Sequence, residues 1–117
     1  MDQQEMRDRT KAFALRVIRL VASLPRNRTA DVLGRQALRA ATSIGANYRE
    51  ATRASSRKQF VSTLSIAQRE ADETLYWLEL IAESERIAPE RLDDLRDECD
   101  QLLSIITATI RTTKTRS

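Results

Sequence analysis

Two glutamates one helical turn apart are the residues of this chain best suited to chemistry. Glu70 and Glu73 lie three positions apart in an apolar helical pattern, so both carboxylates project from one face of a helix. Such a pair could bind a divalent cation or act as an acid and a base. The alternative is pairing with arginines of the preceding helix or of a neighbouring chain. We favour pairing, because histidine is absent and no second carboxylate pair faces the same core.

The sequence offers few residues for other kinds of catalysis. Without histidine, serine and threonine have no imidazole base, and neither a G-x-S-x-G motif nor a glycine-rich phosphate loop occurs. Cys99, the single cysteine, belongs to an apolar stripe, which indicates a buried and inert thiol. A cluster of cysteine and histidine ligands cannot form. We therefore expect no enzymatic activity, no cofactor and no metal site.

A row of arginines is the second feature that could support a chemical function. On a helical wheel the row occupies a sector of about 80°, which Asp31 shares. Guanidinium groups in a row can bind the phosphates of RNA or DNA, although most charged rows are merely solvated helix faces. Lys58 and Arg57 follow the row along the chain. The predicted nucleic-acid-binding residues are Arg28, Arg35, Arg39, Arg49, Arg53, Arg57 and Lys58.

The elements that position these residues are four predicted helices, at about 3–24, 28–54, 57–84 and 89–112, in a single domain spanning residues 1–117. Asp2 with Glu5 and Ser56 with Gln59 have the spacing of capping boxes, and Pro89 suits the first turn of a helix. The tail from Arg111 is expected to fray. Short connections predict an all-α, up-down-up-down antiparallel four-helix bundle.

A second apolar face on the third helix predicts self-association. It lies roughly 100° from the core stripe, and a helix that is apolar on two faces needs two partners. A flanking helix is the alternative partner, but a large tryptophan is typical of interfaces between subunits. The predicted interface residues are Ile66, Glu70, Glu73, Trp77, Leu80 and Ile81.

Two further features concern location and packing. Charges interrupt the N-terminal segment too often for a signal peptide or membrane span, so we expect a cytoplasmic protein without membrane contact. Gly34 and Gly45 lie inside the second helix, where each costs about 1 kcal/mol relative to alanine. Close approach of a neighbouring helix would explain that cost, and simple tolerance of glycine is the alternative.

Several spaced motifs resemble one family. The strings QALRAATSIGANYREA at 36–51 and SRKQF at 56–60, with the A-x-x-E-A-x-E-T-x-Y-W-L-E-L run at 67–80, resemble the proteins encoded in intervening sequences of bacterial 23S ribosomal RNA genes. The resemblance implies a bundle that assembles into a ring, commonly a homopentamer, with no known catalytic activity. It also implies association with nucleic acid, and similar bundles are accessory proteins of the reverse transcriptases of diversity-generating retroelements. The family often has an I-A-E-G-like string where this chain has Tyr48 to Ala51, so a glycine is lost and an arginine gained.

Three hypotheses follow. The first is a non-enzymatic homo-oligomer that contacts RNA or DNA backbone through the arginines of the second helix. The second is a protein-interaction scaffold, in which those arginines bind an acidic partner or the neighbouring subunit. The third is a divalent-metal nucleotide pyrophosphohydrolase that uses Glu70, Glu73 and the acidic fourth helix.

Overall fold

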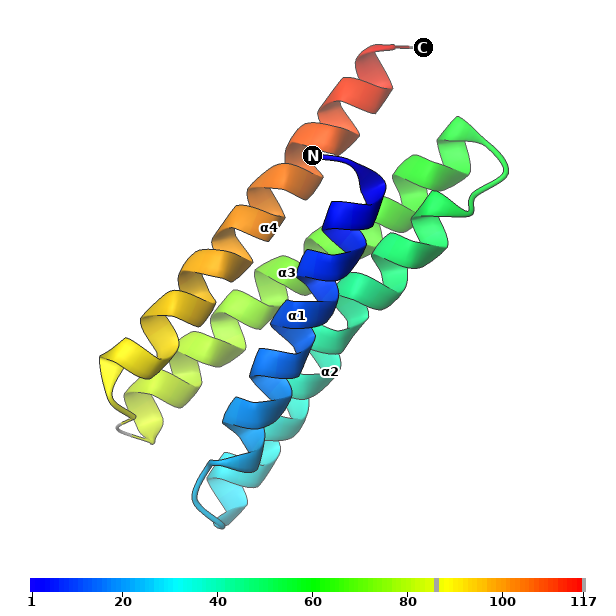
Figure 1. Ribbon diagram of the computed structural model, residues 1–117. Coiled ribbons are helices and arrows are strands. Elements are labelled where there is room, and N and C mark those ends of the chain that lie inside the picture. The colour runs from blue at the N-terminus through cyan, green and yellow to red at the C-terminus, as the bar shows by residue number, and fades with distance from the viewer. Residues whose placement is uncertain (86, 117) are drawn as a thin grey trace.

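Four helices follow one another with short connections in the computed structural model, which describes residues 1–85 and 87–116. They are α1 (Gln3–Ala22), α2 (Arg28–Thr52), α3 (Arg57–Ser84) and α4 (Pro89–Thr115). Successive helices run in opposite directions, and both chain termini lie at the end of the molecule where α2 leads into α3 (Figure 1). The predicted all-α, four-helix architecture is confirmed, and the described residues contain no strand.

Local side-chain bonds explain where the helices begin. Asp2, Asn27 and Ser56 each adopt an extended backbone, and each side chain accepts a hydrogen bond from the backbone N–H three residues later. These bonds satisfy amides that have no partner inside the helix. At α4, Pro89 occupies the first turn, where its missing N–H costs nothing.

The end of α4 corrects one expectation. We expected fraying from Arg111, but α4 remains helical to Thr115. Ile110 anchors this segment because it is only 7% exposed. The hydroxyls of Thr109 and Thr113 donate to the carbonyls four residues earlier, at 2.8 Å each, so these polar side chains are satisfied within the helix.

The core runs along the axis between the helices and is almost entirely aliphatic. Its largest fully buried members come from every helix, and they include Phe13, Ile44, Leu64 and Ile106. Cys99 is also fully buried, and its thiol donates to the carbonyl oxygen of Ala71 at 3.3 Å. Burial raises the pKa of this thiol to about 12.

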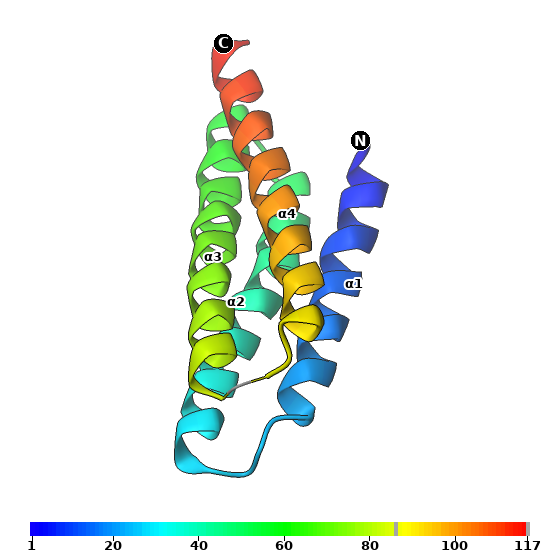
Figure 2. The same ribbon diagram turned by 90° about the vertical axis from the view of Figure 1, so that its left-hand side faces the viewer.

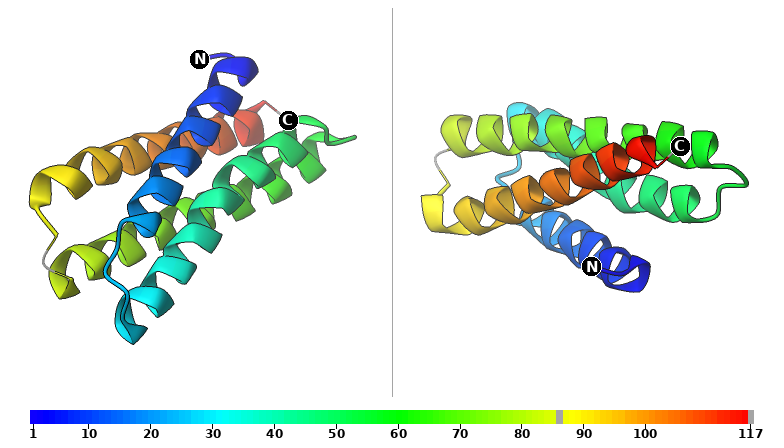
Figure 3. Two further views of the ribbon diagram at one scale, coloured as in Figure 1. Left: turned by 60° about the horizontal axis from the view of Figure 1, so that its bottom comes forward. Right: turned by 90° about the horizontal axis from the view of Figure 1, so that it is seen from above.

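Helix α1 is placed asymmetrically. It packs along α2, whereas its contact with α4 is limited. Figures 2 and 3 show α1 diverging from α4 towards the N-terminus, and we call the line along which these two helices meet the α1–α4 seam. Three polar residues bridge this seam: Arg9 of α1 bonds to Glu98 and Gln101 of α4.

The two glycines of α2 lie where α1 approaches closely. A Cβ atom on Gly45 would be 3.1 Å from Oγ1 of Thr10, and one on Gly34 would be 3.0 Å from Cγ1 of Val21. Both distances are tighter than ordinary van der Waals contact. The structure therefore favours close helix approach as the reason for these glycines.

Candidate nucleic-acid interface

Four of the five predicted α2 arginines are exposed cations without a carboxylate partner. Arg28, Arg35, Arg49 and Arg53 are all exposed, and none forms an ion pair within residues 1–85 and 87–116. Arg28 is the first residue of α2, and Arg53 caps its C-terminal end. The row therefore spans the full length of the helix, and we call these four residues the α2 arginine row.

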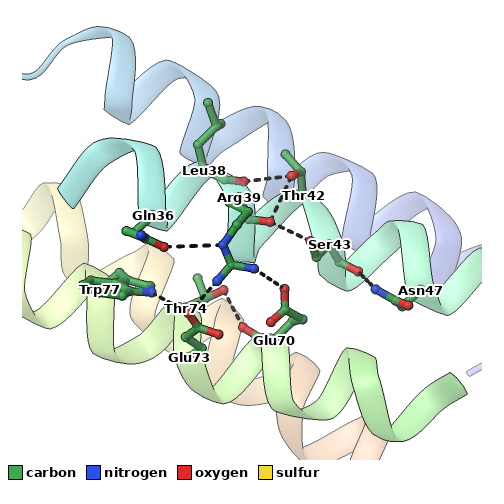
Figure 4. Close-up of polar contacts among 10 residues, drawn as sticks. All are labelled: Gln36, Leu38, Arg39, Thr42, Ser43, Asn47, Glu70, Glu73, Thr74 and Trp77. Carbon is green, nitrogen blue, oxygen red and sulfur yellow. Dashed lines mark hydrogen bonds and ion pairs between the residues drawn. The ribbon is translucent and has the colours of Figure 1, made fainter. Parts of the chain in front are cut away.

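Arg39 behaves differently, because carboxylates of α3 engage it. Its guanidinium donates to Glu70 at 2.9 Å and to Glu73 at 2.5 Å, with a weaker contact to Gln36 at 3.4 Å (Figure 4). The bond to Glu73 is the main reason that the pKa of Arg39 lies above its ordinary value. Pairing of Glu70 and Glu73 with an arginine of the second helix is thus confirmed. Arg39 contributes to contact between α2 and α3, and its charge is already neutralised.

Trp77 completes this polar network. Its indole N–H donates to the same carboxylate of Glu73 at 3.0 Å, as Figure 4 shows. This bond, followed by those from Arg39, lowers the pKa of Glu73 below its ordinary value. Among the described residues no group of three or more histidine, cysteine, aspartate or glutamate side chains is arranged to hold a metal ion.

Helix α1 adds basic residues that the sequence reasoning missed. Two surface hollows lie between α1 and α2. The hollow nearer the N-terminus of α1 is lined by Arg7 and Lys11 of α1 together with Arg49 of α2. The hollow nearer the connection between α1 and α2 is lined by Arg26 and Arg35, with Asp31 as an acidic neighbour. Two members of the α2 arginine row, Arg35 and Arg49, therefore line basic hollows between the two helices, which together we call the α1–α2 groove.

Arg7 is the most constrained of these cations. Its guanidinium donates to the hydroxyl of Thr52 at 2.7 Å, while its Nε atom is buried without a partner in the described structure. Periodicity within one helix could not have found Arg7 or Lys11, because the rotation of α1 against α2 decides which of its residues border the groove.

The start of α3 carries the last two predicted residues. Arg57 and Lys58 are exposed and line a groove with Thr113 and Lys114 near the end of α4. Arg57 donates to the carbonyl oxygen of Arg116 at 3.0 Å. This basic surface lies at the same end of the molecule as Arg53.

The outer face of α3 differs in part from the predicted interface. Ile66 is 38% exposed, and Trp77 and Leu80 are partly exposed. Ile81 does not belong to the exposed outer face, because it is fully buried in the core of the bundle. It lies three residues after Leu78 and so shares the core stripe. Tyr76, which we did not predict, is 54% exposed and packs edge-on against Trp77 with ring centroids 5.3 Å apart.

The fold and surface together define an all-α bundle with a basic groove on α1 and α2 and an apolar face on α3. The chain belongs to the 23S rRNA-intervening sequence protein family, whose model matches residues 2–108. It is also similar to a crystal structure from Bacteroides thetaiotaomicron, described as a protein with unknown function from the S23 ribosomal protein family. The two share 36% identity with a TM-score of 0.87, over 95% of this chain and 99% of the other.

No curated protein matches this chain significantly. Within the described residues, no helix combines the length and the apolar character needed to cross a membrane.

Proposed function

We propose that this protein is a non-enzymatic, homo-oligomeric bundle protein of the cytoplasm that binds the phosphate backbone of RNA or DNA through the α2 arginine row. One observation carries the proposal: four exposed arginines follow α2 without a carboxylate partner among the described residues. At 1.5 Å per residue, the 25 residues of α2 extend over roughly 37 Å. A row of that length can contact several phosphates.

The contrast with Arg39 strengthens this reading. Where α2 faces α3, the fold supplies two carboxylates for one guanidinium. Along the α2 arginine row no carboxylate forms an ion pair within the described chain, although Asp31 lies near Arg35. Unneutralised cations near one another repel, and a polyanion relieves that repulsion while releasing its own counterions. Binding should therefore weaken steeply as salt increases.

The homo-oligomer rests on the outer face of α3. Ile66, Tyr76, Trp77 and Leu80 present apolar surface there. Large aromatic side chains are typical anchors of interfaces between subunits. A ring, with five subunits as the family resemblance implies, would bury this face and leave α1 and α2 available to the nucleic acid.

The competing enzymatic hypothesis requires Glu70 and Glu73 as metal ligands. Both carboxylates bind Arg39, so a cation would have to displace a bidentate partner. This engagement supports a non-enzymatic role. Calorimetry with Mg²⁺ or Mn²⁺ tests it directly, and stoichiometric binding would favour the pyrophosphohydrolase.

The scaffold hypothesis also has an observation in its favour. A groove between α3 and α4 is lined by one arginine, Arg96, and by four carboxylates: Glu79, Asp93, Asp97 and Asp100. The arginines of one copy could bind this groove on another. In that case neutralising the arginines would change the molar mass measured by light scattering.

Fluorescence anisotropy with labelled single-stranded RNA and duplex DNA tests the proposal. We expect the triple variant R35Q/R49Q/R53Q to bind more weakly at about 50 mM salt and to lower the slope of log K against log salt by roughly two units. R39Q should leave the slope unchanged, because Arg39 is neutralised by Glu70 and Glu73.

The matched control is R69Q/R96Q/R111Q, which removes the same charge from exposed arginines of α3 and α4. If both triple variants weaken binding equally, the effect reflects net charge and not the α2 arginine row. If R35Q/R49Q/R53Q retains wild-type affinity and slope, the proposed function is wrong.

A further inference from the structure

A second basic groove lies on the opposite flank of α1. Arg16 and Arg19 of α1 and Arg91 of α4 line it, over Leu20 and Leu95, which are only 4% and 3% exposed. No carboxylate belongs to the described residues that line this groove. Three guanidinium groups from two helices thus share one surface hollow, which we call the α1–α4 arginine groove.

The fold holds one of these groups in place and leaves the other two unbound. Arg91 donates to the hydroxyl of Ser23 at 2.7 Å, and that hydroxyl donates to the carbonyl oxygen of Leu20 at 2.7 Å. Arg16 and Arg19 project from one face of α1 because they are three residues apart. Neither side chain makes a hydrogen bond or an ion pair within the described structure.

Two turns earlier on the same flank of α1, the chain does neutralise an arginine. Arg9 bonds to both carboxylate oxygens of Glu98, at 3.0 and 2.6 Å, and to Gln101 at 3.2 Å. Along the contact between α1 and α4, Glu98 therefore neutralises the arginine nearer the N-terminus of α1. No carboxylate of the described lining neutralises the three arginines nearer its C-terminus. The carbonyls at the C-terminal end of α1 offset part of this positive charge. An external anion would offset the rest.

We propose that the α1–α4 arginine groove binds a phosphate group. Arginine binds phosphate through paired, charge-assisted hydrogen bonds, and three arginines from two directions can surround one phosphate. This proposal rests on the proposed function, because the phosphate is assigned to the backbone of the same nucleic acid. A free polyphosphate offers the same chemistry and is the second source to be tested.

The position of the groove links it to the α2 arginine row. The C-terminal half of α1 borders the α1–α4 arginine groove through Arg16 and Arg19, and it borders the α1–α2 groove through Val21 and Ala22. One helix, about 10 Å in diameter, separates the two grooves. A strand of nucleic acid that crosses α1 contacts phosphate-binding residues on both sides of this helix. The surface covered by the nucleic acid therefore extends beyond α2.

The test uses the full chain with R16Q/R19Q and R16Q/R19Q/R91Q. The double variant leaves the bond between Arg91 and Ser23 intact and removes no side-chain hydrogen bond or ion pair of the described structure, so it should fold normally. We expect the triple variant to lower the salt slope for labelled RNA by roughly two units and to weaken affinity more than tenfold at about 50 mM salt. R69Q/R96Q/R111Q is again the matched control.

Several results separate this inference from the proposed function. If R35Q/R49Q/R53Q lowers the slope but R16Q/R19Q/R91Q does not, only the α1–α4 arginine groove is refuted. If wild type binds tripolyphosphate in calorimetry but not RNA or DNA, and R16Q/R19Q abolishes that binding, the groove takes a free polyphosphate and the proposed function fails. If none of these probes binds, both proposals are wrong.

Light scattering on the same variants excludes one further explanation. If R16Q/R19Q changes the number of subunits while RNA affinity per assembly is unchanged, the arginines bind a neighbouring copy. That outcome overturns the assignment to phosphate.

Discussion

The carboxylate of Glu70 accepts a hydrogen bond from Arg39 at 2.9 Å, so that α2 and α3 are linked near the middle of both helices. The side chain of Glu70 is 13% exposed and that of Arg39 is 49% exposed. The pair thus lies at the edge of the core, where water screens it only in part.

We expect Arg39→Gln to lower the free energy of unfolding by about 1 kcal/mol, at the upper end of the range for surface ion pairs. In this variant Glu70 loses its only guanidinium partner within the described structure. Urea denaturation followed by circular dichroism measures the change. Arg35→Gln is the control, because Arg35 forms no ion pair in the described structure. Equal effects from both substitutions would contradict a structural role for Arg39.

The bond from Trp77 to Glu73 predicts a dependence on pH. Glu73 has a folded-state pKa below its ordinary value of 4.5, so its stabilising contribution is complete above that pH and is lost as the pH falls through the folded-state pKa. Trp77→Phe removes the indole donor, which is the largest cause of the lowered pKa. The stability difference between wild type and this variant should therefore shrink between pH 6 and roughly pH 3.

Tyr76→Phe provides the comparison for this experiment. The phenol of Tyr76 is exposed and makes no described hydrogen bond to a carboxylate, so any loss of stability should be independent of pH over the same interval. A constant difference between wild type and Trp77→Phe at all pH values would show that Trp77 acts only through packing.

Gly45 should be less tolerant of substitution than Gly34. A Cβ atom at Gly45 meets Oγ1 and Cβ of Thr10 at 3.1 and 3.3 Å, and Thr10 is fixed because its hydroxyl donates to the carbonyl of Met6 at 2.8 Å. Overpacking of this kind costs roughly 1–3 kcal/mol, against a gain of about 1 kcal/mol in helix propensity. We expect Gly45→Ala to lower the free energy of unfolding by about 1 kcal/mol.

At Gly34 the closest atoms belong to the ends of the side chains of Val21 and Leu24, beside the end of α1. Those atoms can shift, so Gly34→Ala should be nearly neutral in urea denaturation. A double-mutant cycle between Thr10→Ala and Gly45→Ala should show positive coupling. A more stable Gly45→Ala protein would contradict close approach as the reason for the glycine.

Cys99 reports on opening of the core. Its thiol is fully buried, and with a pKa of about 12 only about one molecule in ten thousand carries a thiolate at pH 8. We expect an aromatic disulfide reagent to label the native protein only as fast as it unfolds, and to label it rapidly in urea. Cys99 is the sole cysteine, so the signal is unambiguous. Rapid labelling in native buffer would mean that α4 opens locally.

Signals within a few residues predicted the fold well. The capping interactions of Asp2 and Ser56 were readable from spacing alone, and both are confirmed. The reciprocal half of the second capping box differs, because Gln59 accepts from the backbone N–H of Ser55 at 2.9 Å. The bounds of α3 agree with the prediction at both ends. Such features depend on one helix and its immediate neighbours in the chain.

Features that depend on how helices face one another were less predictable. Arg39 shares a wheel sector with Arg35, yet only Arg39 lies close enough to α3 to pair with its carboxylates. Ile81 lies at the boundary between the core stripe and the outer apolar face of α3. The rotation of α3 about its own axis decides that Ile81 is buried. The α1–α4 arginine groove combines residues 75 positions apart, from Arg16 to Arg91 (91 − 16 = 75), and no periodicity within either helix predicts that meeting.

The limited contact between α1 and α4 has a consequence for the order of events during folding. Most contact in this bundle joins helices that are adjacent in the chain, whereas the pair of Arg9 and Glu98 closes a loop of 89 residues. Bringing distant segments together is the slow, entropically costly part of folding, and little of this structure depends on it. The chain should therefore fold within about milliseconds as successive helical hairpins. Association between copies, which depends on concentration, would then join subunits that have already folded.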